Sequence, residues 1–373
     1  MTAPMGLYVH VPFCHSKCPY CDFYSVVPSD ASLLDTYTAR VCEALCAAGT
    51  GEQVDTLYFG GGTPSLLGGK RLAAIVTAAR AAFSLSADSE ITLEANPADD
   101  LYDTLAAFAA VGGNRLSLGM QSAHGEELRL LGRRHVPGDV MRTLSDARAV
   151  GITNLSLDLM LGVAAQDDTA ALSSVATAVS CGVPHVSAYM LKIEPGTPYA
   201  VSPPEGLADG DALADRYLAV CEALEAAGLA QYEISNFARP GFESRHNSKY
   251  WDLTPYLGIG PAAHSYYRGR RFHYLRDLAA FLRGEPPVSD NDDVIPAGSE
   301  EEYLCLRLRT VAGLEETAFA ARFGRPIPAA WRNAADRLPH WLVKSDAAGI
   351  RLTREGFLVS NAVTVQLLDV TNG

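Results

Sequence analysis

The sequence predicts an α/β fold: an incomplete barrel of parallel strands covered by helices, followed by a small C-terminal domain. Three observations lead to this prediction. Short apolar runs alternate with longer amphipathic stretches as far as Ala227, which is typical of parallel strands joined by helices. Six of these runs are clear strands, whereas a closed barrel of this kind needs eight. The composition then changes after residue 283.

Each expected strand is a short apolar run, and each expected helix is a longer stretch with one apolar face. The strands are Leu7–Val11, Val54–Phe59, Ile91–Glu94, Arg115–Leu118, Asn154–Leu159 and His185–Leu191. The helices are Leu33–Ala48, Lys70–Phe83, Asp99–Val111, two stretches before Val150, one that ends near Cys181, and Ala212–Ala227. Notable polar residues lie at or just after the carboxyl ends of the strands, where such sheets place their sites.

The C-terminal part follows a stretch rich in Pro, Asp and Gly, which suits a linker at 284–299. We therefore expect a barrel domain at 1–283 and a C-terminal domain at 300–373. The expected elements of the latter are Glu300–Thr310, Leu314–Phe323, Pro328–Leu338, Leu342–Ser345 and Ile350–Leu352. Helices followed by a short hairpin indicate a helical, winged-helix-like module that packs on the barrel or contacts a partner.

The composition excludes several classes of protein. The chain of 373 residues carries a net charge of −13, so it lacks the basic surface that nucleic acids need. No apolar run is long enough to cross a bilayer, and the first residues lack a signal pattern. We expect a cytoplasmic protein, either free or held at a membrane through a partner.

Three of the eight cysteines, Cys14, Cys18 and Cys21, form a C-x3-C-x2-C pattern. Three thiolates can hold three irons of a [4Fe–4S] cluster and leave the fourth iron open, whereas most iron–sulfur proteins supply four ligands. A zinc site is the alternative at this point, since His10 or His15 could complete it. The other five cysteines, Cys42, Cys46, Cys181, Cys221 and Cys305, are interpreted as small core residues.

A glycine-rich run, residues 60–65, directly follows the second expected strand. Glycines there let the backbone approach a ligand closely. The run is not a phosphate-binding P-loop, because it lacks the Gly-Lys-Ser/Thr ending. With this run one strand after the three cysteines, the chain resembles the radical S-adenosylmethionine (SAM) family.

The resemblance implies a partial (β/α)6 TIM-like barrel, a [4Fe–4S] cluster on Cys14, Cys18 and Cys21, and SAM bound to the open iron. In that family the reduced cluster cleaves SAM to methionine and a 5′-deoxyadenosyl radical. Matched motif by motif, the SAM contacts implied are Tyr8, Tyr20, Gly61, Gly62, Thr63, Glu94, Gln121, Arg133, Asp158 and Ala188. A carboxylate for the SAM ammonium and a guanidinium for its carboxylate are the expected physical partners.

Within that family the chain resembles the HemW-type heme chaperones and the related oxygen-independent coproporphyrinogen III dehydrogenases. The motif His-Asn-x-x-Tyr-Trp of the chaperone type is present at residues 246–251, in a segment at 231–268 that we expect to handle heme. The residues implied are His246, Asn247, Tyr250 and Trp251; His264 is a second heme candidate. From spacing alone, a packed aromatic pair with a satisfied histidine is the simpler interpretation.

Besides that motif, two features favour the chaperone type over the dehydrogenases. Cys21 is followed by Asp22 and Phe23, not by a further cysteine one residue on, and only thirteen residues precede Cys14. Two positions depart from the family pattern. A proline is missing before Gln166, which leaves the role of that residue open, and Ser244 stands where relatives often carry cysteine.

The resemblance implies a heme chaperone that binds heme, the cluster and SAM and delivers heme to acceptor hemoproteins such as respiratory cytochromes. An electron donor such as flavodoxin or ferredoxin would reduce the cluster. The alternative is a dehydrogenase that decarboxylates coproporphyrinogen III to protoporphyrinogen IX, so the sequence leaves open whether the protein is an enzyme. A third hypothesis, reductive opening of heme, has no positive mark in the sequence.

Overall fold

The computed structural model describes residues 3–49, 51–97, 100–290 and 295–369. A sheet of twelve strands forms the core of the larger unit, in the order β12-β11-β10-β9-β1-β2-β3-β4-β5-β6-β8-β7. The six central strands are β1 (Met5–Val11), β2 (Gln53–Gly61), β3 (Ser84–Ala95), β4 (Arg115–Gln121), β5 (Asn154–Leu161) and β6 (His185–Met190). They are parallel and adjacent in chain order, which confirms the expected partial barrel.

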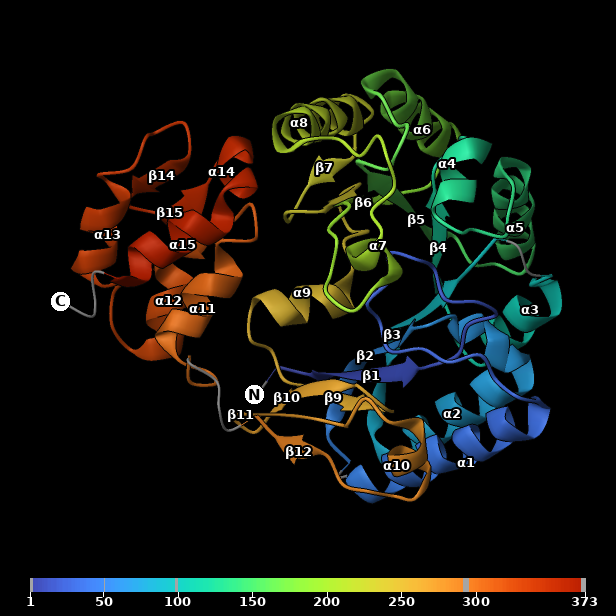
Figure 1. Ribbon diagram of the computed structural model, residues 1–373. Coiled ribbons are helices and arrows are strands. Elements are labelled where there is room, and N and C mark those ends of the chain that lie inside the picture. Colours follow the sequence, from blue (N-terminus) through green and yellow to red (C-terminus); the bar gives the residue numbers. More distant parts are fainter. Residues whose placement is uncertain (1–2, 50, 98–99, 291–294, 370–373) are drawn as a thin grey trace.

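Helices cover the outside of these strands (Figure 1). They are α1 (Ala31–Ala48), α2 (Gly68–Ala82), α3 (Tyr102–Ala110), α4 (Gly125–Leu130), α5 (Pro137–Ala149), α6 (Asp168–Ser180) and α8 (Gly210–Ala226), with the short η1 (Pro64–Leu67) and α7 (Pro198–Val201). Apolar side chains from both layers, such as Leu7, Phe59, Leu72 and Phe108, are fully buried between them. Asp99, the expected start of the third helix, lies outside the described residues.

The sheet is wider than the sequence pattern indicates. The additional strands are β7 (Ala230–Gln231), β8 (Asn236–Ala238), β9 (Tyr256–Ile259), β10 (His264–Tyr267), β11 (Arg270–His273) and β12 (Val288–Ser289). β9 is parallel to β1, and the others pair antiparallel at the two flanks. Strands of two to four residues are too short to show a periodic pattern, which is why the sequence did not reveal them.

The C-terminal unit contains α11 (Glu300–Arg307), α12 (Glu316–Phe323), α13 (Ala329–Ala335), α14 (Arg354–Leu358) and α15 (Ser360–Asp369) around a three-stranded sheet. That sheet consists of β13 (Leu314–Glu315), β14 (Val343–Asp346) and β15 (Gly349–Leu352). The expected hairpin is present, whereas the helix expected from Leu314 begins only after a short strand. The sequence analysis did not identify α14 and α15.

The hydrophobic core of the C-terminal unit extends across the expected boundary between the two domains. This core contains Phe319 and Trp331 of the C-terminal unit. Leu253, Tyr256 and Tyr266 contribute to it from the barrel side. Figure 1 shows α9 (Arg245–Trp251) between the barrel and the C-terminal unit. The boundaries at 283/284 and 299/300 stay a prediction. The expected linker includes β12, and α10 (Leu278–Leu282) lies directly before it. Residues 291–294 of the linker lie outside the described part of the chain.

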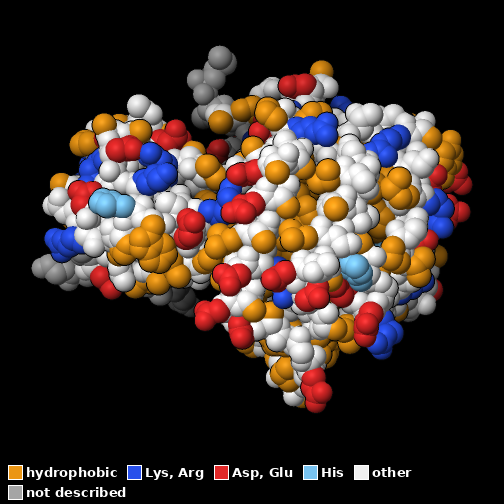
Figure 2. All heavy atoms as spheres, turned by 90° about the horizontal axis from the view of Figure 1, so that it is seen from above, with side chains coloured by type: hydrophobic (Ala, Val, Ile, Leu, Met, Phe, Trp, Pro, Cys, Tyr) orange, Lys and Arg blue, Asp and Glu red, His pale blue; other side chains and the backbone are white. Residues whose placement is uncertain are grey.

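Two further observations concern the surface and the remaining cysteines. On the face seen in Figure 2, Asp and Glu side chains are interspersed with Lys and Arg. Within the described residues, every helix is too short or too polar to span a membrane. The expectation of five core cysteines is wrong for one of them: Cys181 and Cys221 are buried, Cys42 and Cys305 are partly buried, and Cys46 is exposed.

Candidate cofactor site at the carboxyl ends of the strands

A cavity of about 350 Å³ opens at the carboxyl ends of the central strands. Its wall contains Cys14, Cys18 and Cys21 from the loop after β1. Eight of the ten predicted SAM contacts also line it: Tyr20, Gly61, Gly62, Thr63, Glu94, Gln121, Arg133 and Asp158. Residues far apart in the chain meet here because parallel strands bring their carboxyl ends to one rim.

Two of the predicted SAM contacts are not on this wall. Tyr8 lies inside the barrel, where its hydroxyl bonds to Nδ1 of His10 at 3.1 Å and its ring packs near the rings of Tyr58 and His246. Ala188 is buried on β6, and its amide donates to the carbonyl of Ser235 at 2.8 Å. Their predicted roles stay predictions.

The sulfur atoms of the three cysteines are spread more widely than a single zinc ion requires. Around one tetrahedral zinc, sulfur atoms lie roughly 3.8 Å apart, given Zn–S bonds of about 2.3 Å. Among the described residues, the three cysteines do not form a group whose ligand atoms all lie within 4.8 Å of one another. His10 cannot complete a zinc site either. In this conformation its two ring nitrogens bond to Tyr8 and to the carbonyl of Tyr24, so neither nitrogen is free to bind an ion.

The glycine-rich run is held tightly against the end of β1. The amide of Gly62 donates to the carbonyl of Val11 at 2.8 Å, and that of Thr63 donates to the carbonyl of Phe13 at 2.6 Å. A Cβ atom on Gly62 would lie 2.6 Å from that same Phe13 oxygen. Since these amides are already used inside the protein, the run does not form the amide nest that binds anions.

Glu94 on β3 is bonded directly to this run. Tyr58 donates its hydroxyl to Oε1 at 2.7 Å, and the amide of Gly61 donates to Oε2 at 3.2 Å. Burial raises the pKa of Glu94 to about 7, although both hydrogen bonds oppose that shift. A buried carboxyl group with a raised pKa gains from a cation placed beside it. The site therefore suits the amino group of an amino acid.

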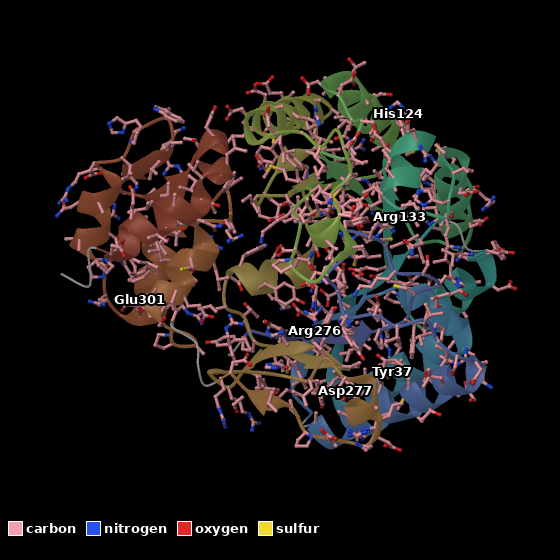
Figure 3. The ribbon with its side chains drawn as sticks, in the orientation of Figure 1. Tyr37, His124, Arg133, Arg276, Asp277 and Glu301 are labelled. Atoms are coloured by element: carbon pink, nitrogen blue, oxygen red, sulfur yellow. The ribbon has the colours of Figure 1, made fainter. Side chains whose placement is uncertain are left out.

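Arg133 brings the complementary charge from the loop after α4 (Figure 3). Its guanidinium donates to Asn96 Oδ1 at 2.9 Å and to the hydroxyl of Tyr20 at 2.6 Å, with its carbon 5.8 Å from the centre of the Tyr20 ring. The Nε atom is buried and has no hydrogen-bond partner among the described residues. Such a group is ready to receive a carboxylate.

Gln121 and Asp158 complete the wall. A register shift after Leu118 and a left-handed backbone at Gln121 (φ 64°) place that side chain at the end of β4. Asp158 accepts from the Ser117 hydroxyl at 3.2 Å, and burial raises its pKa. Both groups can bond to the hydroxyls of a ribose.

Sequence reasoning did not assign a role to Asn96, Tyr58 or Ser117. Asn96 joins two parts of the site, since its amide also donates to the Thr63 hydroxyl at 2.9 Å. The available signal was position: Asn96 directly follows β3, and Tyr58 and Ser117 alternate with apolar residues on strands whose alternate faces point into the barrel.

Gln166, whose role the missing proline left open, has a structural role. It is buried in the loop after β5, where Oε1 accepts from the amide of Gly162 at 2.8 Å and Nε2 donates to Glu127. Ala165 beside it has a left-handed backbone (φ 64°). These bonds shape the turn that proline would otherwise restrict.

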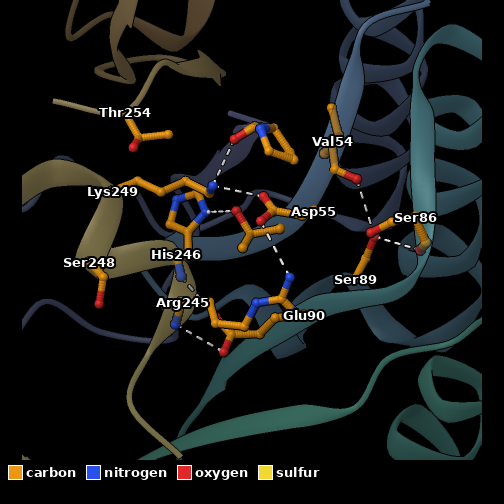
Figure 4. A network of polar contacts seen from close by, with 12 residues as sticks. Val54, Asp55, Ser86, Ser89, Glu90, Arg245, His246, Ser248, Lys249 and Thr254 are labelled. Atoms are coloured by element: carbon orange, nitrogen blue, oxygen red, sulfur yellow. Dashed lines mark hydrogen bonds and ion pairs between the residues drawn. The ribbon is translucent and has the colours of Figure 1, made fainter. Parts of the chain in front are cut away.

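The predicted heme residues lie on α9, at the other end of the barrel. His246 is 1% exposed, with Nδ1 bonded to Thr56 Oγ1 and Nε2 to the Tyr250 hydroxyl, each at 2.8 Å. Its ring stacks on Tyr58 at 5.1 Å, and burial lowers its pKa to about 3, so the imidazole is neutral. Figure 4 shows how Glu90 and Asp55 hold this helix.

The neighbours of His246 are also packed. Tyr250 makes an edge contact with Tyr256 at 4.6 Å, and the backbone N–H of Asn247 donates to the hydroxyl of Ser244, which caps α9. Trp251 is partly buried, and its Nε1 has no partner among the described residues. In this conformation the helix closes the barrel, and the structure does not bring these four residues to the cysteine cavity.

The fold and the cysteine-lined cavity define a radical SAM protein, and the model of the Radical SAM superfamily matches residues 8–172. The chain belongs to the HemW family within that superfamily. It is 38% identical to the heme chaperone HemW of Mycobacterium tuberculosis over 98% of this chain and 95% of that protein. It is 37% identical to the HemW of Escherichia coli over 86% of each chain.

A mitochondrial relative and a solved structure extend these comparisons. The chain is 34% identical to the mitochondrial radical S-adenosyl methionine domain-containing protein 1 of Bos taurus over 97% of this chain and 87% of that protein. The structure of coproporphyrinogen III oxidase (HemN) from E. coli matches with a TM-score of 0.83 and 22% identity, over 98% of this chain and 90% of that one. At that identity the likeness concerns the fold.

Proposed function

We propose that this protein is a heme chaperone that holds a [4Fe–4S] cluster and SAM and passes heme to acceptor hemoproteins. The observation that carries the proposal is the identity of 37–38% with proteins named heme chaperone HemW, which extends over nearly the whole chain. The acceptors would include respiratory cytochromes, reached in the cytoplasm or through a membrane-bound partner. Flavodoxin or ferredoxin would supply the electron.

The cavity residues support the cofactor part of the proposal. Cys14, Cys18 and Cys21 would ligate the cluster, which when reduced supplies an electron to the sulfonium of bound SAM. Glu94 would accept a hydrogen bond from the amino group of SAM, and Arg133 would bind the carboxylate of SAM. Gln121 and Asp158 would orient the ribose, while Gly62 and Thr63 keep the backbone close enough for the cofactor to fit.

The raised pKa of Glu94 predicts a pH dependence of SAM binding. Near pH 7 the carboxyl group is about half protonated, whereas an ammonium ligand favours its ionised form. Cation binding therefore releases a proton below pH 7, and the dissociation constant should fall up to about tenfold per pH unit from 5.5 towards 7, then level off. Equilibrium dialysis with labelled SAM measures this directly.

Two variants separate Glu94 from its neighbours. Glu94→Gln should bind SAM more weakly and lose the step near pH 7. Asp158→Asn should weaken binding but keep that step. Identical pH profiles for Glu94→Gln and the wild type would contradict the assignment of Glu94.

The heme part of the proposal concerns residues 231–268, with His246, Asn247, Tyr250 and Trp251 as contacts. Because both ring nitrogens of His246 are bonded, this residue can bind a heme iron through Nε2 only if the bond to Tyr250 breaks and α9 moves. Tyr250→Phe removes the competing hydroxyl and keeps the ring. We therefore expect this variant to bind heme at least as tightly as the wild type, and His246→Ala to lose the imidazole-ligated heme spectrum.

The test is a hemin titration followed by absorbance, with and without SAM, on the cluster-reconstituted chain. The exposed His340→Ala is the control, and circular dichroism checks that each variant is folded. An unchanged spectrum in folded His246→Ala would remove His246 as a ligand. In parallel, formation of protoporphyrinogen from coproporphyrinogen III by the reduced protein would favour the dehydrogenase and contradict the chaperone.

A further inference from the structure

A group of three metal-ligating side chains lies on the outer flank of the sheet, apart from the cysteine cavity. His264 on β10, His273 on β11 and Asp290 just after β12 place their ligand atoms within 4.8 Å of one another. No function derived above uses His273 or Asp290. His264 was a heme candidate from the sequence alone.

The sheet register builds this arrangement. His264 and His273 are directly paired across the antiparallel strands β10 and β11, so their side chains lie on the same face. Their rings stack with centres 4.9 Å apart. The amide of Asp290 donates to the carbonyl of Arg271 at 3.1 Å, which carries the carboxylate to both rings.

A simple surface ion pair accounts for only part of this geometry. Asp290 bonds to Nδ1 of His273 and thereby has one partner. Nδ1 of His264 faces the other oxygen of the same carboxylate at 3.9 Å, which is too long for a hydrogen bond. Two imidazoles stacked over one carboxylate would repel each other if both were protonated. Burial and the neighbouring His273 lower the pKa of His264, so its neutral form, the one that binds metals, is favoured.

The charges around the group also permit a cation. Arg271 and Arg276 are the nearby positive groups that act on His264. Arg271 forms an ion pair with Glu302, and Arg276 (Figure 3) pairs with Asp22 at 3.3 Å. Each guanidinium is thus balanced by its own carboxylate, which leaves the charge of Asp290 for a ligand.

We propose that His264, His273 and Asp290 form a binding site for a divalent transition-metal ion of the zinc type. Two imidazoles and one carboxylate are a ligand set that such ions favour. The His264 side chain is 64% exposed, so the ion can enter from solvent and keep an open coordination position. Bound there, it would join β10 and β11 to the segment that leads to the C-terminal unit.

The test is a titration of the cluster-reconstituted full chain with Zn²⁺ at pH 7.5, in competition with a chromophoric chelator. Reconstitution occupies Cys14, Cys18 and Cys21, so that these three thiols do not compete for the ion. We expect one equivalent of bound Zn²⁺, with a dissociation constant at least tenfold higher in His264→Ala and in His273→Ala. His340→Ala, which removes an exposed imidazole elsewhere, should bind like the wild type.

Two further measurements distinguish loss of the metal site from misfolding and from a role of His264 in heme binding. Asp290→Asn keeps the shape of the side chain and should also weaken Zn²⁺ binding while the melting temperature without metal stays unchanged. Equal Zn²⁺ titrations for the wild type and His264→Ala would overturn the proposal. Loss of hemin binding but not of Zn²⁺ binding in His264→Ala would also overturn it and assign this histidine to heme iron.

Discussion

Replacing Cys18 with serine should leave the purified protein without its cluster. Cys18 lies half-buried in the wall of the cavity between Cys14 and Cys21, and no fourth cysteine lies on that wall to replace it. A serine hydroxyl stays protonated at neutral pH and is a poor ligand for iron. Iron and sulfide should fall from about four of each per chain to near zero after anaerobic reconstitution, and the visible absorbance of the cluster should disappear.

Cys46→Ser is the matched control for this experiment. Cys46 is an exposed cysteine on α1, outside the cavity, and its replacement should leave iron and sulfide at the wild-type level. Full iron and sulfide in Cys18→Ser would contradict the ligand assignment. So would stoichiometric zinc in the wild-type protein purified without oxygen, since the cysteine pattern would then serve a different metal.

Arg133→Ala should have the second largest effect, on SAM binding. The guanidinium is buried, joins Asn96 to Tyr20 and is positioned to meet a carboxylate. Loss of one partner of a buried charged hydrogen bond costs about 2 kcal/mol or more, which is roughly thirtyfold or more in the dissociation constant. Equilibrium dialysis of the cluster-loaded protein measures this change.

Two further arginine variants test the specificity of that effect. Arg133→Lys keeps the charge but cannot bond to Asn96 and Tyr20 with one planar group, so its affinity should lie between those of the wild type and the alanine variant. Arg129→Ala removes an exposed side chain on the preceding helix α4 and should bind like the wild type. Wild-type affinity in Arg133→Ala would exclude Arg133 from the SAM site.

The order of strands and helices could be predicted as far as α8 because the long elements have clear periodicity. Leu7–Val11 and Asn154–Leu159, for example, fall within β1 and β5. The flanks of the sheet could not be predicted in this way. Strands such as β9 and β12 form because neighbouring backbone offers hydrogen-bond partners, and their own two to four residues carry little pattern.

The site was predictable to a similar degree. The cysteine spacing and the positions of polar residues at strand ends indicated where the site lies, since the carboxyl ends of parallel strands share one rim, and the family resemblance implied which residues line it. The bridging role of Asn96 was not visible, because it depends on which side chains from the loops after β2 and α4 meet across the cavity.

Local pattern was thus enough to predict the barrel class and the three cysteines as a metal site, while the residues that line the cavity around them were implied by the family resemblance. The buried state of His246 and the meeting of His264, His273 and Asp290 followed only from folding. Both depend on contacts between segments separated in the sequence, such as Thr56 with His246 and the register of β10 on β11. Hydrophobic periodicity describes one element at a time, whereas burial and charge pairing depend on how elements pack together.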